Sequence, residues 1–208
     1  MTYFGMSQKQ ERGRPIGMLS MALYDKCYSE TEAKGVEYGL FPWYANPSLG
    51  RPHEPFPPGL CLVVKELPHV DFDIRGDSKF FHIVSEKFVE VMNRLGAEFA
   101  DAQPINLRDP VGRKIAEKQY WATKFKRVEI ADALDMGQSE LFPRKDRIKK
   151  FRMRSDFSLH AFQLRGMAPG HDTVFCSEHF VRLASDIDFK GVDFLPLDAN
   201  ASGAFTQI

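Results

Sequence analysis

Residues 81–105 read FHIVSEKFVEVMNRLGAEFADAQPI, and residues 173–197 read TVFCSEHFVRLASDIDFKGVDFLPL. The two stretches align without a gap, and six positions of the first are identical in the second: Ser85, Glu86, Phe88, Val89, Asp101 and Pro104 recur as Ser177, Glu178, Phe180, Val181, Asp193 and Pro196. Each stretch has the pattern of an apolar strand, an amphipathic helix and a second strand that ends at proline. The sequence therefore predicts an internal strand-helix-strand duplication.

The Ser-Glu pair in each copy predicts the start of a helix. Serine is a favoured N-cap residue, because its side-chain oxygen accepts a hydrogen bond from a free backbone N–H of the first turn. A glutamate beside it interacts favourably with the positive end of the helix dipole. We therefore assign capping roles to Ser85, Glu86, Ser177 and Glu178. The apolar residues that follow have helical spacing, so both helices should pack against a sheet.

Short apolar or alternating runs predict strands in the rest of the chain. They cover residues 18–24, 36–41, 60–67, 70–75 and 157–164, with one long strand or a bent pair over residues 118–130. Together with the repeats, they predict an α+β protein in which a twisted, mainly antiparallel sheet is flanked by helices.

The chain divides into three expected parts. Residues 1–59 form an N-terminal segment with short strands, in which residues 1–17 are a flexible lead-in and residues 42–59 are too rich in proline for a helix or a central strand. Residues 60–197 form the α+β domain, and residues 198–208 form a flexible tail.

Composition points to an ordinary globular protein. The chain has 208 residues with 28 acidic and 28 basic side chains, so no net field attracts nucleic acid or an anionic membrane. The three cysteines (Cys27, Cys61 and Cys176) are far apart and predict neither a disulfide framework nor a zinc ribbon. No stretch has the length or apolarity of a signal peptide or a membrane span. We expect a reduced cytoplasmic protein with no cofactor and with no nucleic acid or membrane as a partner.

One pair of residues suggests an enzyme, a hydrolase or transferase that uses Cys176 and His179. A cysteine just before a helix N-terminus can have a lowered thiol pKa, and a nearby histidine could accept its proton. The first copy, however, has Val84 and Lys87 at the equivalent positions. We therefore expect Cys176 to be a buried structural thiol and the protein not to be an enzyme.

Two charged segments are candidate binding surfaces. Asp132, Asp135 and Glu140 surround a predicted turn, where they could meet a basic partner or satisfy backbone amides. A basic run over residues 144–154 could contact the phosphates of a nucleic acid, form a solvated edge strand or face an acidic protein. A nucleic-acid-binding module is thus a third interpretation.

Several segments also carry a family resemblance: IVSEKF at 83–88, ADALD at 131–135, CSEHF at 176–180 and KGVDFLPL at 190–197. As an ordered set, they resemble the Imm11 (DUF1629) family of bacterial immunity proteins, which is associated with polymorphic toxin systems such as type VI secretion. The resemblance implies a protein that binds and neutralises a cognate toxin, with no catalytic residues to carry over. A homo-oligomer is also compatible with it. The candidate toxin-binding residues are Asp132, Asp135, Glu140, Arg144, Lys145 and Arg147.

Overall fold

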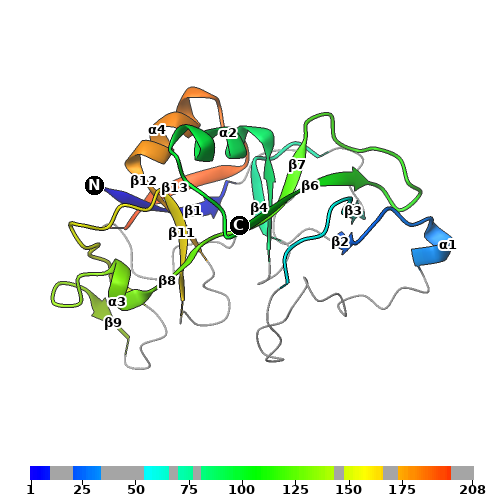
Figure 1. Ribbon diagram of the computed structural model, residues 1–208. Helices are drawn as coiled ribbons and strands as arrows, with labels where there is room; N and C mark the ends of the chain where they lie inside the picture. Colours follow the sequence, from blue (N-terminus) through cyan, green and yellow to red (C-terminus); the bar gives the residue numbers. More distant parts are fainter. Residues whose placement is uncertain are drawn as a thin grey trace.

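The computed structural model describes residues 1–9, 21–33, 54–65, 70–76, 81–142, 148–165 and 173–197. Within these residues the chain forms two curled sheets that lie side by side, a two-stranded ribbon and four short helices (Figure 1). Most strand pairs are antiparallel, and two helices lie together above the junction of the sheets. The predicted α+β architecture is confirmed.

The first sheet has six strands. Their order across the sheet is β2 (Met21–Tyr24), β3 (Cys61–Val64), β6 (Asp101–Arg108), β7 (Tyr120–Lys124), β5 (His82–Ser85) and β4 (Ile74–Gly76). Only the pairing of β3 with β6 is parallel in this sheet. One face carries a buried cluster that includes Leu23, Leu62, Ile83 and Tyr120.

The second sheet has five strands, and one of its interior strands is formed by the N-terminal residues. The order is β13 (Val192–Pro196), β1 (Tyr3–Gln8), β12 (Val174–Ser177), β11 (Ala161–Arg165) and β8 (Arg127–Glu129). The prediction of a flexible lead-in is therefore wrong for residues 3–8. β1 lies between β13 and β12 over residues 4–5 and continues along β13 to Gln8. Its polar residues Ser7 and Gln8 are buried as well, although their polarity had suggested exposure.

The two repeat segments occupy corresponding places in the two sheets. In each, a helix (α2, Glu86–Arg94; α4, Glu178–Asp186) connects a strand to a second strand two places away, with one antiparallel strand between them. The intervening strand is β7 in the first sheet and β1 in the second. The strand-helix-strand order is thus present twice, while its origin by duplication stays a prediction.

Serines cap both of these helices. Ser85 Oγ accepts a hydrogen bond from the backbone N–H of Phe88 at 3.4 Å, and Ser177 Oγ accepts one from Phe180 at 3.2 Å. The helices lie side by side in Figure 1, and the ring centroids of Phe88 and Phe180 are 5.0 Å apart. Their buried faces fill a core that both sheets share.

A buried carboxylate fastens the two sheets together. Asp73 is fully buried and accepts hydrogen bonds from Ser85 Oγ, from Lys118 Nζ at 3.0 Å and from the backbone N–H of Lys190 at 2.6 Å. The alternating pattern of residues 70–75 had predicted a half-exposed strand. The described strand begins at Ile74 and is not half-exposed, because Asp73 and Arg75, which were expected to face solvent, are both fully buried.

A lysine pair surrounds the neighbouring Asp71. Lys118 Nζ and Lys190 Nζ each lie 3.0 Å from one of its carboxylate oxygens. Burial acts to raise the pKa of Asp71, but the hydrogen bonds and charges of the two lysines outweigh it and lower that pKa to about 2. Lys190 belongs to the second repeat segment, so this cluster also joins the two halves.

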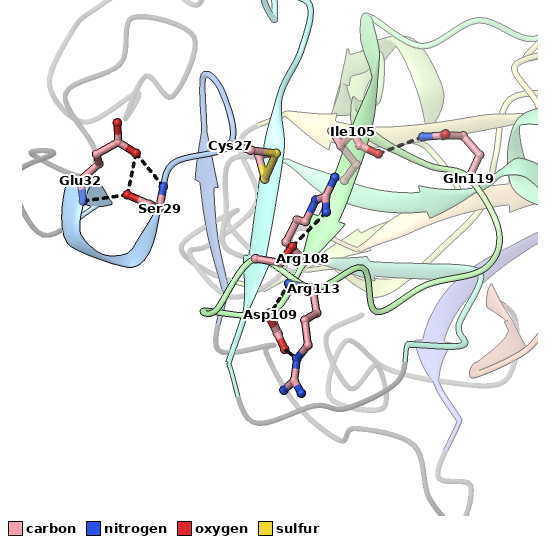
Figure 2. The surroundings of a disulfide bond; sticks show 10 residues. Cys27, Ser29, Glu32, Ile105, Arg108, Asp109, Arg113 and Gln119 are labelled. Atoms are coloured by element: carbon pink, nitrogen blue, oxygen red, sulfur yellow. Dashed lines mark hydrogen bonds and ion pairs between the residues drawn. A yellow bond between two sulfur atoms is a disulfide. The ribbon is translucent and has the colours of Figure 1, made fainter.

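Cys27 and Cys61 form a disulfide, which corrects the expectation of a reduced protein without a disulfide framework (Figure 2). Cys61 lies opposite Tyr24 in the pairing of β3 with β2, and the chain turns back after Tyr24 so that the Cα atoms of the two cysteines are 5.0 Å apart. The bond fixes the segment that leads into α1 (Glu30–Ala33) to the edge of the first sheet. A Ser29–Glu32 capping pair follows it.

The run over residues 118–130 is a bent pair, one of the two predicted alternatives. β7 ends at Lys124 in the first sheet, and β8 begins at Arg127 in the second. The predicted strand 36–41, the tail 198–208 and residues 42–53 of the proline-rich segment lie outside the described residues. Among the helices that are described, none is long and apolar enough to cross a membrane.

Candidate functional site

Residues 130–142 and 148–156 form an excursion from the second sheet that carries the three acidic candidates. It contains α3 (Ile130–Ala133), β9 (Glu140–Leu141) and β10 (Ile148–Lys150), and lies at the lower left of Figure 1. An isolated bridge between Leu134 and Met153 closes it. Its apolar residues pack against the second sheet, so the excursion is anchored: Ala133, Leu134, Ile148 and Phe151 are buried with Phe162 and Phe175.

The turn after α3 is held by Asp135. Its Oδ1 accepts a hydrogen bond from the backbone N–H of Gly137 at 3.0 Å, and its Oδ2 accepts one from Gln138 Nε2 at 2.8 Å. Ser139 Oγ binds both the backbone N–H and the carbonyl of Arg152, at 3.0 and 3.1 Å. Asp135 is thereby committed to shaping the turn.

The other candidates differ in what engages them. Asp132 is exposed on α3, and the exposed Glu140 forms an ion pair with Lys149 across the β9–β10 ribbon. Arg144, Lys145 and Arg147 lie outside the described residues. The structure thus brings the three acidic candidates onto one excursion.

Two adjoining hollows open on this excursion, and Arg154 lines both. The larger hollow has a volume of about 410 Å³ and lies between the start of β1, the Asp135 turn and residues 151–155. The smaller hollow, of about 280 Å³, lies between Asp132 and residues 156–159. Together they form one surface that combines the N-terminal strand with the excursion.

Arg154 is the charged centre of the smaller hollow. Its Nε and Nη2 donate to the two carboxylate oxygens of Asp156 at 2.9 and 2.8 Å, a two-pronged ion pair. The hydrogen bond and charge of Asp156 raise the pKa of Arg154, with further contributions from Asp132 and Asp135. The same hydrogen bond lowers the pKa of Asp156.

Arg152 lines the larger hollow in a different state. Its side chain is exposed, and within the described part of the chain no hydrogen bond or ion pair engages its guanidinium. Three buried residues also line this hollow: Tyr3, Phe151 and Leu197. The hollow therefore combines an available cation with apolar side chains.

Large apolar side chains are exposed next to the same surface. Met1, which lines the larger hollow, is 53% exposed, and Met136, in the Asp135 turn, is 47% exposed. Only Val111 is comparable among the described residues. Methionine is a flexible apolar residue that many protein-binding surfaces use.

The Cys176 thiol lacks the surroundings of a nucleophile. Cys176 is fully buried, and burial raises its pKa well above the usual range. The described residues show no hydrogen bond between Cys176 and His179, whose ring lies 5.8 Å from that of His160. His160 Nδ1 is instead 2.8 Å from the capping oxygen of Ser177. This geometry gives no support to the Cys-His enzyme.

Sequence reasoning missed part of this surface. Tyr3 and Met1 were assigned to a lead-in, and Arg152 and Arg154 were seen only as members of a basic run. Asp156 was not among the predicted site residues, although its spacing of two from Arg154 suits a local ion pair. Among the described residues there is no group of three His, Cys, Asp or Glu side chains that could hold a metal ion.

Comparison with known families identifies the chain more closely. Residues 6–202, nearly all of it, match the sequence model of the family described as immunity protein 43. No curated protein matches the chain significantly. The predicted kinship with immunity proteins is confirmed, although the matching family is immunity protein 43 and kinship with Imm11 in particular stays a prediction. The chain belongs to the immunity protein 43 family.

Proposed function

We propose that this protein is a bacterial immunity protein that neutralises a cognate toxin by stoichiometric binding. The observation that carries the proposal is the match to the immunity protein 43 family over residues 6–202. The proposed setting is a polymorphic toxin system such as type VI secretion, in which the producing cell needs protection from its own toxin.

The surface that we propose for the toxin is the excursion at residues 130–142 and 148–156 together with the start of β1. It combines acidic side chains at Asp132 and Glu140, cations at Arg152 and Arg154, and exposed Met1 and Met136. Tight protein interfaces are typically organised around a few such anchors, with complementary charge giving specificity and a fast association rate. By their place in the sequence, Arg144, Lys145 and Arg147 belong to the same proposal.

Neutralisation by binding requires no reactive group on the immunity protein itself. The burial of Cys176 and the raised pKa of its thiol agree with a non-enzymatic role. The two serines that the repeats share, Ser85 and Ser177, are also buried and accept hydrogen bonds from the helices that they cap.

We further propose that the protein acts in the cytoplasm, where a toxin that reaches the cell interior would be met. The Cys27–Cys61 disulfide bears on this part of the proposal, because disulfides persist mainly in oxidising compartments. Trapping the thiols with an alkylating reagent in intact cells, followed by mass spectrometry, decides it. Fully alkylated Cys27 and Cys61 support the cytoplasm, and an intact bond points to an oxidising compartment.

Co-expression tests the function. We expect the toxin to be encoded by a neighbouring gene. That gene's product should stop growth when it is produced alone, and growth should return when this chain is produced with it. The Cys176→Ala variant should protect equally well, because the thiol is only a core residue. Loss of protection by a Cys176→Ala protein that still folds would favour the enzyme instead.

A further inference from the structure

We infer that the larger hollow receives an acidic side chain of the toxin, with the Arg152 guanidinium as its main partner. This inference rests on the proposed function and specifies where and by what chemistry the toxin is held. It depends on the charge within the hollow, on the apolar residues that line it and on the charges around it.

The balance of available charge in the hollow is positive. Asp135 is its only acidic lining residue among those described, and both of its carboxylate oxygens already accept hydrogen bonds within the turn. Arg154 is paired with Asp156, which does not line this hollow. Arg152 lines the hollow with a guanidinium that no hydrogen bond or ion pair engages within the described part of the chain, and a guanidinium binds a carboxylate with two parallel hydrogen bonds.

The geometry of Arg152 favours this role. Its backbone is fixed on both sides, because its carbonyl accepts from the N–H of Asp135 at 2.8 Å and its N–H donates to Ser139 Oγ at 3.0 Å. The exposed side chain therefore extends from a rigid base. A preorganised base reduces the entropy that binding must overcome.

The lining and the rim favour a protein over a nucleic acid. Buried Tyr3, Phe151 and Leu197 offer apolar contact to the stem of an acidic side chain and its neighbours. Asp132 and Asp156 line the adjoining hollow and would repel a second phosphate of a nucleic-acid backbone. A single carboxylate with apolar neighbours gains these apolar contacts and places no second negative charge near Asp132 and Asp156.

Charge reversal tests the inference. The probe is the toxin against which this chain protects on co-expression, carrying an inactivating substitution, with its affinity measured by isothermal titration calorimetry. Arg152→Glu should weaken binding at least about 30-fold, the size of a central arginine anchor. Arg182→Glu, at an exposed arginine on α4 outside the hollow, is the matched control and should change the affinity less than about threefold.

A rescue on the toxin side identifies the carboxylate. One Asp→Lys or Glu→Lys substitution in the toxin should restore binding to Arg152→Glu while weakening binding to the unchanged chain. Circular dichroism should give both arginine variants the melting temperature of the original protein. Unaltered affinity of a folded Arg152→Glu protein would overturn the inference while leaving the proposed function intact.

Two other outcomes are distinct from that one. If the unchanged chain does not bind the toxin at all, the proposed function itself fails. If the chain binds RNA at low salt and Arg152→Glu abolishes that binding, the hollow serves phosphate, and the assignment of a protein carboxylate is overturned.

Discussion

Tyr3 lies directly opposite Ser177 in the pairing of β1 with β12, just as Tyr120 lies opposite Ser85 in the pairing of β7 with β5. The backbone repeats the relationship one residue on, where Glu178 N–H donates to the carbonyl of Thr2 as Glu86 N–H donates to that of Gln119. β1 therefore completes the second half of the protein as β7 completes the first. The N-terminal residues are part of the core.

The first prediction follows from the place of Tyr3. Its ring is buried against Phe157 and Phe162, and its hydroxyl donates to the Phe157 carbonyl at 2.8 Å. Tyr3→Ala should lower the free energy of unfolding by about 3–5 kcal/mol, and Tyr3→Phe by only about 1 kcal/mol. Denaturant titration measures both. A Tyr3→Ala protein of unchanged stability would show that β1 is dispensable.

The second prediction compares the two capping serines. Ser177→Ala removes a cap and the 2.8 Å contact with His160 Nδ1, and should cost about 1–2 kcal/mol. Ser85→Ala should cost about 1 kcal/mol more, because the second bond of Ser85 Oγ goes to the buried carboxylate of Asp73, and hydrogen bonds to charged groups contribute more. Equal losses of unfolding free energy in the two variants would mean that the bond to Asp73 contributes little.

The third prediction concerns His82 and pH. Burial, with a smaller effect of the Arg127 charge, lowers the pKa of His82 to about 4, against about 6.5 for an unfolded histidine. The unfolded chain therefore takes up a proton before the folded protein does as the pH falls. The contribution of neutral His82 is complete above pH 6.5 and is lost between about pH 6.5 and 4.

The size of this effect can be isolated between pH 7.5 and pH 5, where most carboxylates remain ionised. The unchanged protein should lose on the order of 2 kcal/mol of unfolding free energy over this range. A His82→Gln protein should lose clearly less. Some slope should remain, because burial and the charge of His179 also lower the pKa of His160. Identical slopes would assign the pH dependence elsewhere.

The fourth prediction concerns the disulfide. The bond closes a loop over a sequence separation of 34 residues, for which chain entropy gives a stabilisation of about 3–4 kcal/mol. Replacing both Cys27 and Cys61 by serine should lower the unfolding free energy by an amount of this order. Treating the unchanged protein with dithiothreitol should reproduce most of the loss, and the same reagent should leave the serine variant unaffected. A reductant effect on both proteins would point away from this bond.

Sequence reasoning reached what is local in this fold. The Ser-Glu pairs and the apolar spacing after them indicated both strand-helix-strand units, because a cap and an amphipathic face lie within about ten residues of each other. β1 could not be predicted in the same way, since its partners Ser177 and Pro196 lie at the opposite end of the chain. The disulfide depends likewise on how β2 pairs with β3.

The candidate site shows the same division. Asp132, Asp135 and Glu140 were identified from a local cluster of charge, and they do share one excursion. The pattern could not show that both carboxylate oxygens of Asp135 accept hydrogen bonds within the turn. Nor could it show that the Arg152 guanidinium has no hydrogen-bond or ion-pair partner among the described residues. That distinction depends on two side chains: Gln138 donates to Asp135, and Asp156 pairs with Arg154 and not with Arg152. It also depends on the N-terminus reaching the excursion.

The central claim is that this protein binds a toxin directly, and the stoichiometry of that binding tests it most directly. Purified chain should be titrated into an inactivated form of the toxin against which it protects on co-expression, with the heat of binding recorded. We expect a saturable transition with a fixed whole-number ratio and an affinity that weakens as salt is added, because charged groups line the proposed surface. The absence of any binding, together with no protection on co-expression, would contradict the account.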